Sequence, residues 1–138
     1  MSPSDVQKRP TLIGKERNVL SKNKRREGGI YEEIAAEWLK KQGLVILERN
    51  FRCRQGEIDL IARDNDYLVF VEIKYRKNKG SGWAVEAVDR RKQEKIRRVA
   101  LFYIVRTGRP VDSPYRFDVL GFDGSMITWI KNAYEEQR

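Results

Sequence analysis

Two carboxylates, Asp59 and Glu72, lie in two strand-like segments on either side of a turn at Asn65 and Asp66. If the segments form an antiparallel hairpin closed around these two turn residues, Asp59 faces Glu72. Directly opposed carboxylates on a sheet have Cβ atoms roughly 5 Å apart and repel one another. A divalent metal ion between them would remove this repulsion, so a metal site is the leading interpretation.

The same register places Glu57 opposite Lys74, on the face that carries the acid pair, because side chains alternate between the faces of a strand. The other face of the expected hairpin is apolar and consists of Ile58, Leu60, Ala62, Val69, Val71 and Ile73. The alternative to a metal site is a solvated face with a cross-strand ion pair between Glu57 and Lys74.

This arrangement meets the needs of metal-dependent phosphodiester hydrolysis. Asp59 and Glu72 can hold Mg²⁺, with the Ile73 carbonyl as a further oxygen ligand, and the metal polarises the phosphate. Lys74 can orient the attacking water or stabilise charge on the phosphorus. We therefore expect Asp59, Glu72 and Lys74 to be the catalytic residues.

The composition excludes several other kinds of site. The chain of 138 residues has no histidine and a single cysteine, Cys53, which removes histidine bases, internal disulfides and cysteine-rich zinc sites. A metal must then be held by oxygen, which favours Mg²⁺ or Mn²⁺ over zinc. No apolar run has the length of a membrane span or the character of a secretory signal, so we expect a cytoplasmic protein with no membrane partner.

The net charge of +9 favours a polyanionic partner, although a soluble basic protein would show the same total. Residues 1–28 hold eight Lys and Arg against three acids and so carry +5 of that charge. Residues 1–27 also have few large apolar side chains, which predicts a basic, disordered N-terminal arm. Residues 28–138 are expected to form a single domain.

The expected elements give an α/β fold, with a mixed central sheet flanked by helices in the order α-β-β-β-α-β-β. A helix begins at Gly29 and ends at Gln42-Gly43, where the apolar stripe stops. The remaining elements are a short strand at 44–47, the hairpin at 56–74, a helix from about 85 to 105, and a hairpin of 115–122 with 125–131 around Asp123-Gly124.

Glu32 is a candidate for a further metal acid, because it lies at the margin of the apolar stripe of the first helix and can reach a neighbouring site. An acid in the first turn of a helix also suits the helix dipole, which is the alternative reading. The basic loop after the hairpin and the polar side of the second helix are expected to contact nucleic-acid phosphates, through Lys77, Lys79, Arg91, Lys92, Lys95 and Arg98. A solvated basic face is the alternative.

The segments 56–62 and 69–76 closely resemble the YraN-like family of uncharacterised bacterial proteins, and the resemblance covers roughly residues 28–120. That family resembles a branch of the restriction-endonuclease-like, PD-(D/E)xK nuclease superfamily, similar in layout to archaeal Holliday junction resolvases. The resemblance implies a restriction-endonuclease-like fold. It also assigns the metal acids to Asp59 and Glu72, the lysine to Lys74 and the helical glutamate to Glu32.

Together these observations predict a Mg²⁺- or Mn²⁺-dependent endonuclease that binds and cuts DNA, with a preference for a DNA structure such as a branch. A homodimer would suit symmetric cutting of a junction. The main alternative is a nucleic-acid-binding module that kept a nuclease fold and lost efficient turnover. A third hypothesis is a protein-interaction role in which the basic surface meets an acidic partner.

Overall fold

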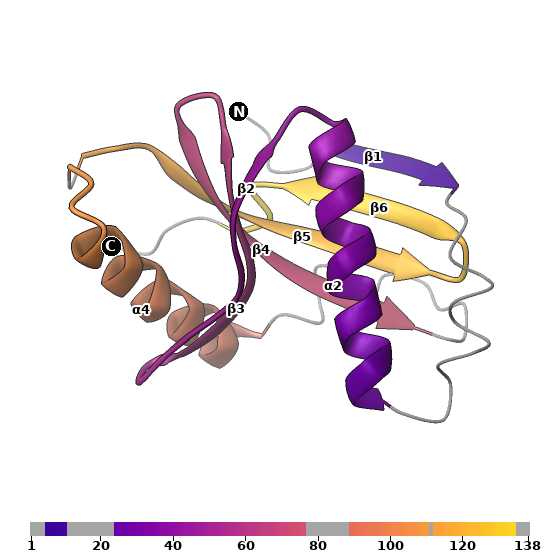
Figure 1. The fold of residues 1–138 in the computed structure, drawn as a ribbon, viewed down its shortest axis with the longest axis horizontal. Helices are drawn as coiled ribbons and strands as arrows, with labels where there is room; N and C mark the ends of the chain where they lie inside the picture. The colour runs from indigo at the N-terminus through magenta and orange to yellow at the C-terminus, as the bar shows by residue number, and fades with distance from the viewer. Residues whose placement is uncertain (1–4, 11–23, 77–88, 111, 135–138) are drawn as a thin grey trace.

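The structure is a computed structural model that describes residues 5–10, 24–76, 89–110 and 112–134. Its elements are labelled in Figure 1. They are β1 (Asp5–Pro10), α2 (Lys24–Lys41), β2 (Val45–Cys53), β3 (Gly56–Asp64), β4 (Tyr67–Arg76), α4 (Arg90–Arg106), β5 (Tyr115–Asp123) and β6 (Met126–Lys131). Neither helix in these ranges is both long and apolar enough to cross a membrane.

The strands form one six-stranded mixed sheet in the order β1-β6-β5-β4-β3-β2. β4 and β5 are parallel and the other described pairs are antiparallel. A parallel pair needs a crossover connection, and α4 lies in the segment that joins β4 to β5. The expected α/β class and the expected order of elements from the first helix onward are confirmed.

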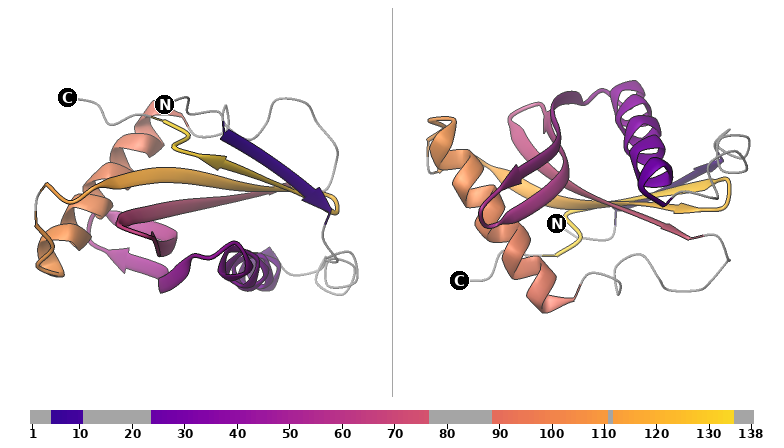
Figure 2. Two further views of the ribbon diagram at one scale, coloured as in Figure 1. Left: turned by 90° about the horizontal axis from the view of Figure 1, so that it is seen from above. Right: turned by 60° about the horizontal axis from the view of Figure 1, so that its bottom comes forward.

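Each face of the sheet packs against one helix, and the two views in Figure 2 show the sheet between them. On one face, Tyr31, Ala35 and Leu39 of α2 pack over Val69 and Val71. On the other face, α4 covers a second cluster that includes Ile61, Phe70, Ile96, Val99 and Tyr103. Both faces of the β3–β4 hairpin are therefore apolar near its turn, and the expectation of a single apolar face was incomplete.

The predicted register of this hairpin is confirmed from Asp64, opposite Tyr67, to Leu60, opposite Val71. Asn65 has a positive φ of 55°, which suits a tight turn. The ladder between β3 and β4 ends at Leu60 and Val71, and the first part of β3 stays paired with β2 alone. We call the point where β3 and β4 separate the fork; it holds Asp59 and Glu72.

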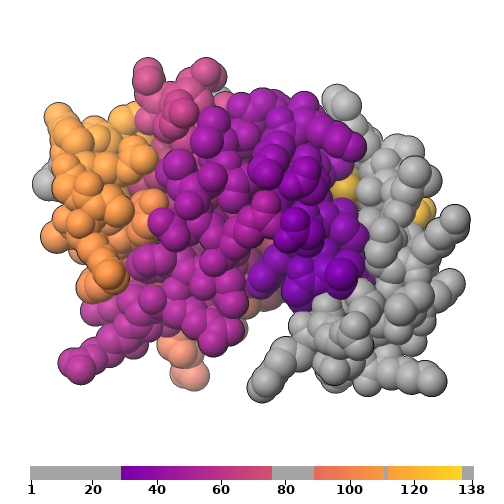
Figure 3. All heavy atoms as spheres, viewed as in Figure 1, coloured from indigo at the N-terminus to yellow at the C-terminus, as the bar shows by residue number. Residues whose placement is uncertain are grey.

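β2 is longer than the predicted short strand at 44–47, because it continues to Cys53. It lies at an edge of the sheet, where backbone pairing with β3 does not require alternating apolar side chains, so its polar second half gave no strand signal. A bulge between Ile46 and Glu48 and a positive φ of 53° at Asn50 make its course irregular. Figure 3 shows the side chains of β2, β3 and α2 at the centre of one face of the molecule.

Other predicted boundaries also shift. Within the predicted arm 1–27, Asp5–Pro10 form β1 on β6, and α2 begins at Lys24; the structure differs from the predicted disorder in these two parts. Backbone pairing with β6 explains a strand there without an apolar face. The rest of that range lies outside the described residues, as do residues 85–88 of the predicted second helix. The helix α4 begins after its N-cap Asp89. The last hairpin closes around Gly124-Ser125, one residue later than expected.

Asp118 on β5 is the centre of a buried network. Its carboxylate accepts hydrogen bonds from Trp129 Nε1 (2.9 Å), from the backbone amide of Asn132 (2.9 Å) and from Arg116 Nε (3.0 Å). Arg116 also donates to Asp64, on β3, at 2.9 Å. The network ties the strand after the crossover to β6 and to the β3–β4 hairpin.

We expect Asp118→Asn to lower the free energy of unfolding by about 2–4 kcal/mol, because an amide cannot accept all of these donors and leaves Arg116 under-compensated. Asp64→Asn is the matched control: its carboxylate is more exposed, so the loss should be about 1 kcal/mol or less. Urea unfolding of both variants measures the difference. Equal losses would show that Asp118 is not the centre of this network.

Candidate functional site

Asp59 is held at the fork by a side-chain contact to the neighbouring strand. Asp59 Oδ2 accepts a hydrogen bond of 2.8 Å from the backbone amide of Ile73. The backbone ladder between β3 and β4 ends at Leu60, the residue next to Asp59. The carboxylate therefore takes the place of a backbone acceptor, and it is fixed beside Glu72.

The two carboxylates interact strongly. Burial, followed by the negative charge of Glu72, raises the pKa of Asp59 to about 7, while the Ile73 amide acts in the opposite direction. This is the behaviour of two acids that share a site with little water. A cation between them would favour the ionised form of Asp59.

Glu72 is almost fully buried and has two lysine partners. Lys92 Nζ, from α4, lies 2.5 Å from Glu72 Oε2, and Lys74 Nζ lies 3.8 Å from the same oxygen. Burial and then the nearby Lys92 ammonium lower the pKa of Lys74. The structure thus brings Asp59, Glu72 and Lys74 together, and it adds Lys92 to them.

These side chains fit a hard divalent cation in the chemistry of their donors. Mg²⁺ prefers oxygen and commonly takes only one or two carboxylates from the protein, with water and substrate phosphate completing its shell. Within the described ranges, no group of three or more acid or cysteine side chains is placed to hold a metal. Ile73 contributes its amide to the site through Asp59, and a ligand role for its carbonyl stays a prediction.

Glu32 lies near the site but does not join the acid pair in a metal-holding group. Burial, and then the charge of Glu57, raise the pKa of Glu32, while Arg52 lowers it. Its negative charge also contributes to the raised pKa of Asp59. Glu32 is thus an electrostatic neighbour of Asp59, and its role as a metal ligand stays a prediction.

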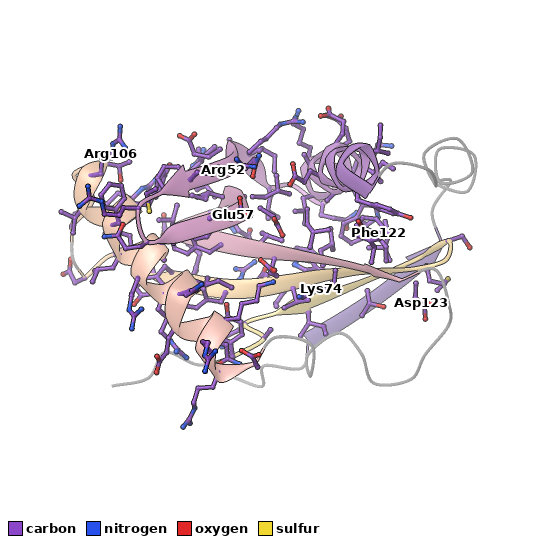
Figure 4. All side chains as sticks on the ribbon, turned by 90° about the horizontal axis from the view of Figure 1, so that it is seen from below. Arg52, Glu57, Lys74, Arg106, Phe122 and Asp123 are labelled. Carbon is purple, nitrogen blue, oxygen red and sulfur yellow. The ribbon has the colours of Figure 1, made fainter. Side chains whose placement is uncertain are left out.

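Glu57 does not face Lys74, contrary to the predicted register. It pairs with Arg52 of β2, both across the strands and through an ion pair of 3.0 Å. The reason is the fork: before Leu60, β3 runs with β2 and away from β4. Figure 4 shows Arg52 and Glu57 close together on β2 and β3, with Lys74 on β4. The Glu57–Lys74 ion pair, which was the alternative to a metal site, is therefore wrong.

The predicted phosphate-binding residues fall into three groups. Lys77 and Lys79 lie outside the described residues. Arg91 and Lys95 are exposed on α4, and Arg98 is exposed with a long contact of 3.9 Å to Glu94. Lys92 instead points into the acid site.

A hollow of about 420 Å³ lies between the end of β2, the start of β3 and the first turns of α4. We call it the basic hollow; it is lined by Arg52, Cys53, Gly56, Glu57, Lys92, Lys95 and Ile96. Three cations and one acid give it a net positive charge. Sequence reasoning missed Arg52 because its place depends on the second half of β2.

Tyr134 was also missed. Burial, and then the charge of Glu72, raise the pKa of its hydroxyl, and its ring stacks on Phe117 with centroids 5.1 Å apart. It follows β6 in the chain, and nothing in its local sequence signals proximity to the acids.

Asp59 should make stability depend on pH when a chelator removes divalent ions. Its pKa of about 7 in the folded protein exceeds the ordinary 3.8, so the folded state binds this proton more tightly than the unfolded state. The contribution to the free energy of unfolding should therefore fall as pH rises from about 4 to about 7. Asp59→Asn keeps an oxygen for the Ile73 amide and should be more stable than wild type at about pH 8, by on the order of 2 kcal/mol. Urea unfolding across this pH range tests this, and identical pH profiles for the two proteins would contradict it.

Comparison with known proteins gives a consistent family. A family described as "Uncharacterised protein family UPF0102" matches residues 31–122. A UPF0102 protein of Colwellia psychrerythraea is 45% identical over 113 residues, covering 78% of this chain and 88% of the relative. One from Lachnoclostridium phytofermentans is 47% identical over 113 residues, covering 82% and 96%. Another, from Photobacterium profundum, is 43% identical over 120 residues, covering 85% and 96%. This chain belongs to the UPF0102 family, the YraN-like proteins that its sequence resembles.

Proposed function

We propose that this protein is a divalent-metal-dependent endonuclease that hydrolyses phosphodiester bonds in DNA. The observation that carries the proposal is the fork, where Asp59 and Glu72 meet with Lys74 beside them. An acid pair of this kind, with an adjacent lysine at a largely buried position, is better explained by a role in phosphoryl transfer than by a role in stabilising the fold. Burial and the charge of Glu72 raise the pKa of Asp59 to about 7, so ionising both acids raises the free energy of the folded state.

The arrangement of the strands supports a restriction-endonuclease-like fold. The acids lie on an antiparallel hairpin, β3–β4, whose second strand is followed by a helix and a parallel strand, β5. This is the layout that the sequence resemblance implies. In it, the two acids and the lysine all project from the centre of the sheet, where their positions are well fixed.

In the proposed mechanism, Asp59 and Glu72 would hold Mg²⁺ or Mn²⁺ at the fork. The bound cation would supply Lewis-acid activation of the phosphodiester. Lys74 would orient the attacking water or stabilise the charge that develops on the phosphate. Its lowered pKa follows from burial and from Lys92, and it makes this ammonium a better proton donor than an exposed lysine.

The charge distribution supports a nucleic-acid partner. The chain carries +9 overall, and the basic hollow lies next to the acid site through the shared residue Lys92. A phosphate backbone that crosses the fork would meet Arg52 and Lys95 on one side. DNA as the natural partner, a preference for branched structures, a homodimer and a cytoplasmic location are parts of this proposal.

A second candidate is a nucleic-acid-binding module without turnover. The observation in its favour is the close Lys92–Glu72 ion pair, which compensates Glu72 without any metal. Under this hypothesis the acids would hold α4 against the sheet, and divalent cations would have no effect on binding. Cation binding at Asp59 and Glu72 separates the two candidates.

Cleavage of a nucleic-acid panel in Mg²⁺ and in Mn²⁺ is the direct experiment. The panel holds single strands, duplexes, flaps and four-way junctions, with RNA versions of the first two. We expect wild type to cut at least one DNA structure, and Asp59→Ala and Lys74→Ala to lower the rate by about 100-fold or more. Salt-sensitive binding with no cutting of any substrate would favour the binding module.

Glu72→Ala should abolish cleavage and leave DNA binding equal or stronger, because it removes a negative charge from a phosphate site. The matched control is Glu37→Ala. It removes an exposed acid on α2, outside the fork, that pairs with Lys40. It should cut as wild type does. Weaker DNA binding by a folded Glu72→Ala protein would argue against the assigned role, and fluorescence anisotropy with a labelled duplex measures it.

A further inference from the structure

Lys92 reaches the acid pair from the first turn of α4. Asp89 caps this helix by accepting a hydrogen bond of 2.9 Å from the backbone amide of Lys92. The cap depends on the backbone of Lys92 and fixes where its side chain starts. From there the ammonium reaches Glu72 Oε2, at 2.5 Å.

A divalent cation on Glu72 would compete with this contact. Mg²⁺ binds carboxylate oxygen at about 2.1 Å, so an ammonium that stayed on the same oxygen would lie close to a doubly charged ion. Like charges at such separations repel strongly where water is scarce. A metal that binds Glu72 Oε2 at the fork therefore requires Lys92 to leave this oxygen.

Of the two lysines on Glu72, Lys92 is the one with freedom to move. The side chain of Lys92 is 43% exposed, whereas that of Lys74 is 20% exposed and lies farther from the carboxylate. Lys92 also lines the basic hollow, so a rotation of its side chain would move the ammonium between two environments, the acid pair and the hollow. One holds an acid and the other is rich in cations.

Among the described residues that line the basic hollow, cations outnumber acids. Glu57, the acid in this described lining, is already paired with Arg52 at 3.0 Å. Lys95 is exposed one turn along α4 from Lys92 and on the same side of the helix. Lys92 could enter this hollow favourably only if a phosphate entered with it.

We propose that Lys92 is a positioning residue that exchanges Glu72 for a backbone phosphate of nucleic acid in the basic hollow when a divalent cation binds at the fork. The metal frees the lysine, and the phosphate holds it in its new place. Metal and nucleic acid then bind cooperatively, and each lowers the dissociation constant of the other by the same factor. This inference rests on the proposed metal site at Asp59 and Glu72.

The first test is titration of the free protein with Mn²⁺, followed by calorimetry or by electron paramagnetic resonance. Lys92→Met should bind Mn²⁺ about fivefold or more tightly than wild type, because no ammonium competes for Glu72. Lys95→Met, the matched control, removes an exposed charge from the same hollow and should change the affinity by less than about twofold. Lys92→Arg, which keeps the charge, should stay near wild type.

The second test measures coupling with a short phosphorothioate duplex, which serves as an uncut probe. In wild type, saturating Mn²⁺ should tighten duplex binding, and in Lys92→Met this tightening should be smaller by about fivefold. Lys95→Met should weaken duplex binding with and without Mn²⁺ by the same factor. Lys92→Gln, with a polar side chain, serves as a second variant should Lys92→Met fold poorly.

The outcomes separate this inference from the proposed function. Equal Mn²⁺ affinity in wild type and in folded Lys92 variants, or equal tightening by Mn²⁺, overturns the exchange and leaves the nuclease proposal intact. Wild type that binds the duplex but no Mn²⁺ overturns the metal-dependent nuclease itself, and the exchange with it.

Discussion

The hydrogen bond from the Ile73 amide to the Asp59 carboxylate is the contact on which the site depends. It lies where the backbone ladder between β3 and β4 stops, so a side chain continues the pairing that the main chain abandons. Without it, the two strands would separate one residue earlier and Asp59 would be free to turn away from Glu72. The bond thus holds two mutually repelling acids in one place, and Lys74 and Lys92 compensate the charge that results.

Two buried acid sites of this sheet differ in how that compensation is made. Asp118 receives an arginine, an indole N–H and a backbone amide, all of which are fixed by the fold. Asp59 and Glu72 receive one backbone amide and two lysines on flexible stems. Fixed donors suit a structural acid, whereas mobile cations leave room for exchange with a ligand. The contrast separates a residue that holds the fold from residues that can do chemistry.

Local signals in the sequence were enough to predict the register of the β3–β4 hairpin from its turn to Leu60 and Val71, and the proximity of Asp59 and Glu72. Turn residues and two alternating segments determine such a pairing over a short distance. The pairing of Glu57 with Arg52 could not be predicted, because it depends on how far β2 extends along an edge where side chains carry no alternation. The place of Lys92 could not be predicted either, since the docking of α4 decides whether a lysine of a basic helix faces water or Glu72.

β4 carries Glu72, Ile73 and Lys74. Its backbone pairs with antiparallel β3 as far as Val71 and with parallel β5 from Leu68 to Arg76. The two edges of the sheet are β1 and β2, each with one partner. Opening of an edge strand costs less free energy than opening of a central one, so the edges exchange their amide hydrogens through local fluctuations, whereas β4 does so only when the core opens. Glu72, half of the acid pair, therefore directly follows the part of the sheet that opens last. Fluctuations that loosen β2, and with it Arg52, would leave the β4 groups in position.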